Sequence, residues 1–308
     1  MSIAFLFPGQ GAQSPGFLHR LPDHATVADT LAEARTVLGR EILELDAEAA
    51  LQSTVAVQLG LLVAGAATAR ALAAEGVAPA MVAGLSVGSF AAAVTAGALA
   101  FPDALRLVDR RARLMEQACP AGFGMVAVTG LPQRRVEAIV TEAGETAPLY
   151  LANLNGPAEF VLSGADAALG RAIEAAQQAG ARRAERLAVA VPSHCPLMQG
   201  AAADLTAAVE SALVTAPRIP MIGNRRARML RDAAAVRKEL ATNLAHPVRW
   251  SDSVTLMAEH GATAFLEMPP GTVLTRLAAA EFPDLPGRDM ESLSLPGARA
   301  FAARTGER

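Results

Sequence analysis

The chain has 308 residues, a length that fits one large α/β domain with an insertion, or two domains. Hydrophobic residues make up 52% and charged residues 19%, which provides for a large core and excludes an intrinsically disordered protein. The formal net charge of −3 and the 4% of aromatic residues argue against a nucleic-acid-binding protein, which needs a basic surface and stacking platforms. With only two cysteines and no CxxC motif, a disulfide framework or a cysteine zinc site is not expected.

The amino-terminal sequence MSIAFLFPGQG has no basic segment and soon turns glycine-rich, so it predicts a strand and not a signal peptide. The longest apolar stretch, residues 55–74, contains Gln58, Arg70 and many small residues, which favours a buried helix over a membrane span. We therefore expect a cytoplasmic protein that has neither a membrane nor a nucleic acid as its partner.

Apolar periodicity predicts an α/β order on either side of a central segment. Up to residue 122, the expected elements are a strand at 2–7, helices at 26–38 and 55–75, a strand at 80–85, and helices at 89–96 and 102–118. From residue 192 onward, they are a helix at 197–212, a strand at 220–223, helices at 234–244 and 251–260, and a strand at 264–267. The tail after residue 283 is rich in proline and glycine and has a charged end, which predicts partial disorder.

The central segment follows another pattern. Its expected elements are strands at 125–128, 149–153, 160–163 and 186–191, and helices at 133–143 and 165–179. Their βαββαβ order is that of a ferredoxin-like unit. We therefore predict a discontinuous large α/β domain of residues 1–122 and 192–308, with a small ferredoxin-like domain inserted at 123–191.

The strongest local motif is G-x-S-x-G, formed by Gly84, Ser86 and Gly88 between an apolar strand and a helix. Such a nucleophile elbow exposes the serine on a tight turn, and the helix that follows favours developing negative charge. The backbone N–H of Val87 is then placed to donate to a tetrahedral oxyanion. The alternative is a tight strand–helix turn in which the serine has only a structural role.

A nucleophilic serine needs a base, and the chain has five histidines. His194 is the candidate, because it follows an apolar run in a proline-flanked turn where the two predicted domains rejoin. His19 and His24 lie in polar sequence, and His246 and His260 fit capping positions. A purely structural role for His194 is the alternative that the sequence leaves open.

Two further features could complete an active site. Gly9-Gln10-Gly11 follows the first strand, where the N–H of Gln10 could be a second oxyanion donor; the alternative is an ordinary turn. This loop lacks the Walker and dinucleotide-binding spacings, so it does not predict a phosphate cradle. The helix at 102–118 carries four arginines, one of which could bind a carboxylate through paired N–H groups, but spacing alone does not say which.

Taken together, these motifs resemble the malonyl-CoA:acyl carrier protein transacylase family. The similar segments occur in the family's order and span residues 3–280. They are FPGQGAQ at 7–13, PAMVAGLSVG at 79–88, RRARLMEQACPAG at 110–122, ANLNGPAEFVLSG at 152–164, VPSHCPLM at 191–198, NLAHPVRW at 243–250 and EMPPGTVLTRL at 267–277. The resemblance implies an α/β-hydrolase-like large domain with an inserted ferredoxin-like small domain.

The resemblance also implies roles for single residues. Ser86 would be the nucleophile and His194 the general base, oriented by the backbone carbonyl of Asn243. Gln10 and Val87 would supply the oxyanion-hole N–H groups. The residues expected to contact the substrate are Arg111, which would bind the malonyl carboxylate, Gln58, Asn155 and Ser193. The family implies malonyl-CoA as substrate, an acyl carrier protein with a phosphopantetheine-type arm as partner, no metal and no permanently bound cofactor.

Two positions depart from the family's usual GHSxGE motif, because Leu85 replaces the histidine and Ser89 replaces the glutamate. The resulting GLSVGSF resembles the malonyltransferase subunit of malonate decarboxylase, which loads malonyl from coenzyme A onto that enzyme's carrier subunit. This resemblance implies that carrier, and the other malonate decarboxylase subunits, as partners. A malonyl transacylase of fatty acid synthesis is the alternative.

Two other classes of function fit parts of the pattern. A serine hydrolase such as a thioesterase shares the elbow, but it leaves a buried Arg111 near the substrate unexplained. A non-catalytic subunit that docks a carrier protein would not need both Ser86 and His194.

Overall fold

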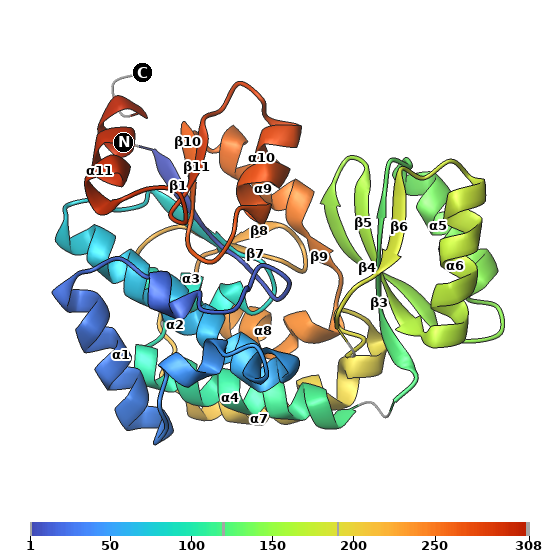
Figure 1. Cartoon of the computed structure of the whole chain (residues 1–308), viewed down its shortest axis with the longest axis horizontal. Helices are drawn as coiled ribbons and strands as arrows, with labels where there is room; N and C mark the ends of the chain where they lie inside the picture. Colours follow the sequence, from blue (N-terminus) through green and yellow to red (C-terminus); the bar gives the residue numbers. More distant parts are fainter. Residues whose placement is uncertain (1, 119–120, 190, 306–308) are drawn as a thin grey trace.

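Two β-sheets, set side by side, organise the chain (Figure 1). The computed structural model describes residues 2–118, 121–189 and 191–305. The larger sheet has six strands in the order β11-β10-β1-β2-β7-β8, and the smaller has five in the order β6-β3-β5-β4-β9. Neighbouring strands of the larger sheet run parallel, except for β7 and β8. The chain is thus a mixed α/β protein, which confirms the predicted class.

The strands of the larger sheet are β1 (Ile3–Phe7), β2 (Met81–Gly84), β7 (Met221–Gly223), β8 (Arg228–Leu230), β10 (Ala264–Glu267) and β11 (Gly287–Asp289). Those of the smaller sheet are β3 (Phe123–Thr129), β4 (Leu149–Gly156), β5 (Glu159–Ala165), β6 (Arg183–Arg186) and β9 (Val248–Arg249). The helices are α1 (Ala25–Leu38), α2 (Thr54–Ala74), α3 (Gly88–Thr95), α4 (Phe101–Ala118), α5 (Gln133–Ala143), α6 (Asp166–Gln178), α7 (Gln199–Ser211), α8 (Ala233–Thr242), α9 (Trp250–Glu259), α10 (Val273–Glu281) and α11 (Leu295–Thr305). Short 3-10 helices lie at Leu18–Arg20, Leu43–Asp46, Ala50–Gln52, Pro196–Met198 and Asn243–Ala245.

The larger sheet is buried on both faces, as a parallel sheet covered by helices requires. In β1, Ile3, Phe5 and Phe7 belong to a core that includes side chains of α2, α3 and α4. Ala4 and Leu6 belong to a second core with side chains of α9 and α10. Because side chains alternate along a strand, one unbroken apolar run supplies both cores and holds the end of β1 rigidly.

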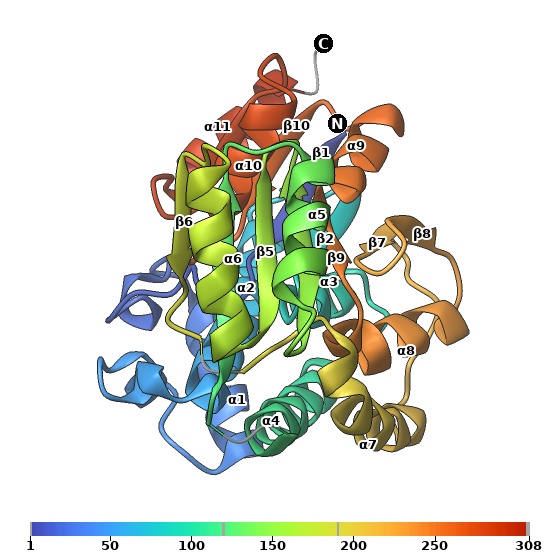
Figure 2. The same cartoon turned by 90° about the vertical axis from the view of Figure 1, so that its right-hand side faces the viewer.

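The helices α5 and α6 cover one face of the smaller sheet. Val126 and Leu162 pack with α5 and α6 on that face, which Figure 2 shows on the side away from the larger sheet. Met125 and Val161 alternate to the opposite face, where they line the space between the two sheets. A strand from beyond residue 192 completes this sheet, since β9 pairs in parallel with β4.

One helix in the described part of the chain, α2, is long and apolar enough to cross a membrane. However, 94% of its most apolar window is buried inside the protein. It contacts α1, α3 and α4 along its length, so it is a core helix, as its small residues and Gln58 predicted.

Two expectations about the backbone are wrong. The strand expected at 186–191 lies earlier, at β6, and Leu187 and Val189 leave the sheet to line the cavity described below. The tail expected to be partly disordered forms β11 and α11, because Leu295, Ala298 and Ala302 recur at helical spacing and join the core beside α2. Residue 190 of that expected strand, residues 119–120 of the arginine-helix motif and residues 306–308 lie outside the described part of the chain.

Gly88 should be essential to this architecture. A Cβ at position 88 would lie 2.2 Å from the carbonyl oxygen of Phe7, and neither backbone can move without opening the sheet. We expect Gly88→Ala to lower the free energy of unfolding by about 3 kcal/mol, the upper part of the usual range for overpacking. Urea unfolding provides the measurement.

Gly170 is the matched control, because it lies in α6 and a Cβ there would meet no atom within 4 Å. Gly170→Ala should raise the free energy of unfolding by about 0.5–1 kcal/mol, since alanine favours a helix. A Gly88→Ala protein as stable as the wild type would contradict the close approach of α3 to β1.

Candidate active site

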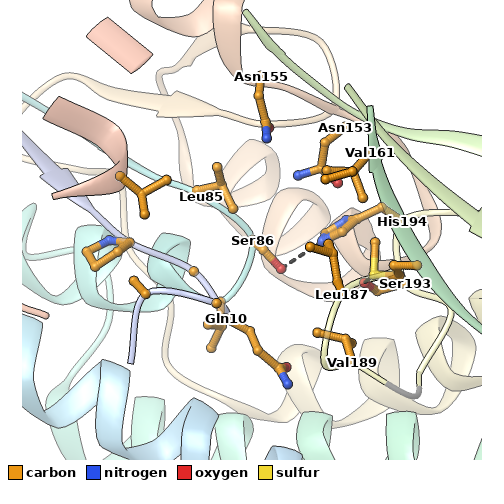
Figure 3. A pocket seen from close by; sticks show the side chains of 18 of the residues that line it. Gln10, Leu85, Ser86, Asn153, Asn155, Val161, Leu187, Val189, Ser193 and His194 are labelled. Atoms are coloured by element: carbon orange, nitrogen blue, oxygen red, sulfur yellow. Dashed lines mark hydrogen bonds between the residues drawn. The ribbon is translucent and has the colours of Figure 1, made fainter. Parts of the chain in front are cut away.

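A cavity of about 970 Å³, including its open mouth, lies between the two sheets. The loops after β1 and β2 form its floor, and the face of the smaller sheet opposite α5 and α6 forms a wall. In open α/β sheets, ligands bind at the carboxyl ends of the strands, which is where this cavity lies. Figure 3 shows the side chains of Ser86 and His194 pointing toward each other inside it.

Ser86 occupies a strained turn between β2 and α3. Its φ of 56° lies in the left-handed region, which residues other than glycine rarely adopt. A Cβ on Gly84 would lie 2.0 Å from the carbonyl carbon of Gly88, so both flanking positions require glycine. The turn aims Oγ into the cavity, as the G-x-S-x-G motif predicted.

His194 accepts a hydrogen bond from the hydroxyl of Ser86. Its Nε2 lies 2.7 Å from Ser86 Oγ, while Nδ1 lies 2.9 Å from the carbonyl oxygen of Asn243 and 3.3 Å from that of His246. Carbonyl oxygens only accept, so Nδ1 carries the proton and Nε2 is left with its lone pair toward the serine. Two backbone carbonyls therefore orient the histidine in place of a carboxylate.

A hydrogen bond also fixes the backbone conformation at His194. Its φ of 61° is left-handed, and its N–H donates to the carbonyl oxygen of Leu244 at 2.7 Å. Burial, and then the charge of Arg111, lower the pKa of His194 from its ordinary value to about 4. The imidazole is consequently neutral at pH 7 and able to accept a proton.

Arg111 is a buried cation beside Ser86. Its side chain is only 1% exposed; Nη2 donates to Ser86 Oγ at 3.2 Å, and Nη1 donates to Gln58 Oε1. It forms no ion pair with an acidic residue in the described part of the chain. Burial lowers the pKa of Arg111 to about 9, so the guanidinium is still charged at neutral pH. Arg113, by contrast, is exposed and pairs with Asp109.

Gln58 holds the guanidinium in place. Its Nε2 donates to Thr54 Oγ1 at 2.9 Å and contacts Met115 Sδ at 3.6 Å, which turns Oε1 toward Arg111. Three helical residues therefore fix one face of the cation and leave another open to the cavity. The orphaned Nε of Arg111 shows that the protein does not satisfy this side chain completely.

The N–H groups of Gln10 and Val87 border the cavity near Ser86, and neither donates a hydrogen bond to a described residue. Val87 immediately precedes α3, where the helix dipole adds partial positive charge. The loop of Gln10 lies against the elbow, since a Cβ on Gly9 would be 2.7 Å from the carbonyl oxygen of Leu85. These positions fit the predicted oxyanion hole, whose function remains a prediction.

The wall toward the smaller sheet is more polar than expected. Asn155 lines the cavity, and so does Asn153, which the sequence pattern did not single out; both amide oxygens are buried without a hydrogen-bond partner among the described residues. The position of Asn155 could have pointed to Asn153, because residues two apart on a strand lie on the same face of the sheet. Ser193 also lines the cavity, but its hydroxyl donates to Met125 Sδ at 3.2 Å.

The two departures from GHSxGE leave the Ser86–His194 pair intact. Leu85 lines the cavity and packs against the core that contains α9 and α10. Ser89 is buried, and its hydroxyl donates to the carbonyl oxygen of Gly84 at 3.0 Å. Among the residues that the structure describes, no group of three or more histidine, cysteine, aspartate or glutamate side chains could hold a metal ion.

A serine, a neutral histidine and unengaged N–H groups at one cavity are the arrangement of serine acyltransferases and hydrolases. The sequence profile of the acyl transferase domain family matches residues 4–296. The chain is 40% identical over 283 residues to the malonyl CoA-acyl carrier protein transacylase of Escherichia coli K12, and 38% identical over 281 residues to that of Salmonella typhimurium, with 89% of this chain and 91% of each relative covered. The chain therefore belongs to the acyl transferase family, among the malonyl-CoA:acyl carrier protein transacylases.

Solved structures agree with this assignment. The acyl-carrier-protein S-malonyltransferase of Burkholderia pseudomallei superposes with a TM-score of 0.93 at 39% identity, over 97% of this chain and 99% of that one. A chain from the complex of a type II PKS acyl-carrier protein with its malonyl-transacylase superposes with a TM-score of 0.93 at 36% identity, over 97% and 99% of the two chains. The similarity extends through both sheets.

The burial of His194 predicts an unusual pH dependence for Ser86. Because its pKa is lowered to about 4, the imidazole should stay neutral between pH 7 and pH 5. The rate at which phenylmethylsulfonyl fluoride modifies Ser86, followed by mass spectrometry, should therefore remain level over this range. An imidazole with the ordinary pKa of ~6.5 would lose most of its reactivity by pH 5.

The variant His194→Ala is the control for this measurement. It should react ~10²–10⁴-fold more slowly at pH 7, the usual contribution of a general base. A wild-type rate that fell with a midpoint near pH 6.5 would contradict the lowered pKa.

Proposed function

We propose that this protein transfers malonyl from malonyl-CoA to the thiol of an acyl carrier protein through an ester on Ser86. The observation that carries the proposal is the buried guanidinium of Arg111, which lies 3.2 Å from Ser86 Oγ and has no acidic partner among the described residues. An anionic acyl group would supply the missing partner, and malonyl carries a carboxylate where acetyl carries only hydrogen. The relatives named as malonyl CoA-acyl carrier protein transacylases support the same substrate and partner.

The chemistry proceeds in two half-reactions. Ser86 Oγ attacks the thioester carbonyl while His194 Nε2 takes its proton; the C–S bond then breaks, and the proton passes to the sulfur of coenzyme A. In the second half, the carrier thiol gives its proton to His194 while its sulfur attacks the ester carbonyl; the C–O bond to Ser86 then breaks, and His194 returns the proton to Ser86 Oγ. Gln10 and Val87 donate their N–H groups to the oxyanion in both steps.

The other residues predicted to contact the substrate lie in two parts of the cavity, one near Arg111 and one on the wall toward the smaller sheet. Gln58 orients Arg111 for the malonyl carboxylate. Asn155 has a buried amide oxygen that is free to accept from an amide of the pantetheine arm, and Ser193 lines the same cavity. Both substrates present that arm. No cofactor is bound permanently; malonyl-CoA enters as substrate.

A serine thioesterase is the alternative that shares Ser86 and His194. Apolar side chains on the cavity wall, among them Met115 and Val161, favour transfer, because they keep water from the acyl-enzyme. A charged clamp is of no use to a hydrolase of neutral acyl groups. A docking subunit without catalysis would not need the 2.7 Å contact between nucleophile and base.

We also propose that residues 123–191 form a ferredoxin-like domain inserted into an α/β-hydrolase-like domain of residues 1–122 and 192–308. Support comes from the order of elements, β3-α5-β4-β5-α6-β6, and from the strand order β6-β3-β5-β4 in the sheet. The insertion supplies the cavity wall that carries Asn155. The protein acts in the cytoplasm, where coenzyme A thioesters and carrier proteins meet.

Arg111 should decide which acyl group reaches Ser86. Malonyl uses the paired donors of the guanidinium, whereas acetyl leaves a desolvated cation unpaired. Arg111→Ala should therefore lose malonyl labelling of Ser86 by roughly 10²-fold or more, as expected for a buried charge contact, and gain acetyl relative to malonyl. Mass spectrometry after brief exposure to either coenzyme A thioester measures both products.

Arg113→Ala is the matched control, because Arg113 lies on the same helix but is exposed and paired with Asp109. It should keep the wild-type preference. Retention of malonyl preference in Arg111→Ala, or its loss in Arg113→Ala, would move the carboxylate site elsewhere.

We propose further that the physiological carrier is the carrier subunit of malonate decarboxylase, and that other subunits of that complex are partners. The motivation is GLSVGSF, with Leu85 on the cavity surface and Ser89 bonded to the elbow. The alternative is the carrier protein of fatty acid synthesis. Side-by-side assays of malonyl transfer to both carriers should give the faster rate with the malonate decarboxylase carrier; a faster rate with the other would establish the fatty-acid role.

A further inference from the structure

Asn224 contacts the nucleophile elbow from the neighbouring strand. The parallel pairing of β2 with β7 ends at Ala83 and Ile222, and Asn224 follows β7 directly. Its side chain is buried, with Nδ2 donating to the carbonyl oxygen of Gly84 at 2.7 Å and Oδ1 accepting from the N–H of Ser86 at 2.7 Å. One side-chain amide thus extends the sheet pairing into the turn.

Two asparagines together hold both peptide planes that flank Ser86. Asn224 fixes the plane on the amino side through the N–H of Ser86, and Asn243 Nδ2 donates to the carbonyl oxygen of Ser86 at 3.2 Å on the carboxyl side. The second plane also contains the N–H of Val87. A left-handed conformation is kept only where the surroundings enforce it, and these two amides are the side chains that do so.

Asn224 is itself fixed at every polar group. Its N–H donates to Glu239 Oε1 at 2.6 Å, and its carbonyl oxygen accepts from the N–H of Arg249 at 2.9 Å. Glu239 comes from α8 and is 4% exposed. Because these contacts fix the backbone of Asn224, its side chain holds the turn at Ser86 in one position.

We propose that Asn224 is a positioning residue for Ser86, whose amide holds the turn so that Oγ stays within reach of His194. This rests on the proposed function only in taking Ser86 as the nucleophile. The two contacts require an acceptor and a donor on one flat group, which only an amide of this length provides. A carboxylate would accept from Ser86 but repel the carbonyl of Gly84, and a methyl group would meet neither need.

The test uses the full-length protein and two variants of Asn224. Both Asn224→Ala and Asn224→Asp should react with phenylmethylsulfonyl fluoride at Ser86 roughly 10- to 100-fold more slowly than the wild type at pH 7, the loss expected from a small misplacement. The KM for malonyl-CoA should change little, because Asn224 does not line the cavity. Thermal melting confirms that each variant is folded at the assay temperature, and Asn224→Asp, which is isosteric, carries the test if the alanine variant does not fold.

Ser89→Ala is the control that shares one partner. Ser89 Oγ also donates to the carbonyl oxygen of Gly84, but it does not touch the N–H of Ser86. Its removal should leave the rate close to that of the wild type, because Gly84 keeps its bond from Asn224.

The pH profile of Asn224→Asp separates positioning from a general loss of structure. The new carboxyl group would be buried beside Gly84 and Glu239, which raise its pKa, with Arg225 as the nearby cation. When protonated, it presents an O–H to Gly84 and a carbonyl oxygen to Ser86, as the amide does. The rate should therefore rise toward the wild-type value between pH 7 and pH 5, while the wild type stays level.

Equal rates for wild type, Asn224→Ala and Asn224→Asp at pH 7 would overturn the proposal, as would an Asn224→Asp rate that stays at its reduced pH 7 value down to pH 5. Sulfonylation of Ser86 does not involve malonyl. The assay therefore tests the role of Asn224 independently of the proposed malonyl transfer. If malonyl-CoA leaves Ser86 unlabelled while sulfonylation still depends on Asn224, the proposed function is wrong and the role of Asn224 stands.

Discussion

The close approach of α3 to the end of β1 is the constraint on which the rest of the site depends. With glycine at positions 84 and 88, the backbone of the helix start reaches the carbonyl of Phe7, and Ser86 is forced into its left-handed turn. From that position, Oγ meets His194 on one side and Arg111 on the other. The apolar strand, whose side chains are locked into two cores, provides the rigid support that such a strained turn requires.

Electrostatics at the site follow from burial. Enclosing Arg111 without an acidic partner destabilises the empty protein, because a buried charge loses its hydration. The same charge helps to keep His194 deprotonated, because a positive guanidinium nearby disfavours a positive imidazole. In the function we propose, the two side chains are thus coupled, since a carboxylate bound to Arg111 would offset the repulsion that Arg111 exerts on a protonated His194.

Much of this could be predicted from the sequence where the signal is local. The elbow was evident because G-x-S-x-G reports a requirement of the backbone at consecutive positions. The number of arginines in α4 does not single out Arg111, but the phase of the helix does. Val108 and Met115 are buried, residue 111 lies on the same buried face, and residues 110 and 113 lie outside that face. Helix phase therefore contained more information than the count of arginines.

Other features had no local signal. Asn224 contacts the elbow from a neighbouring strand far along the chain, and this contact lies outside every motif identified in the sequence. The expected strand at 186–191 was wrong because apolar residues can line a cavity as well as a sheet, and at Leu187 and Val189 they do. In the tail, the apolar spacing of α11 outweighed the content of proline and glycine.

The strand β9 ties catalysis to the mechanical behaviour of the molecule. The segment that supplies the carbonyls of Asn243, Leu244 and His246 to His194 continues directly into β9, which is paired with β4 of the smaller sheet. A hinge motion that swung the smaller sheet away would pull on this segment and disturb the tautomer and aim of the imidazole. An exchange of residues 123–191 with the equivalent segment of a relative should therefore preserve the geometry of His194 only if the stretch leading into β9 is exchanged with it.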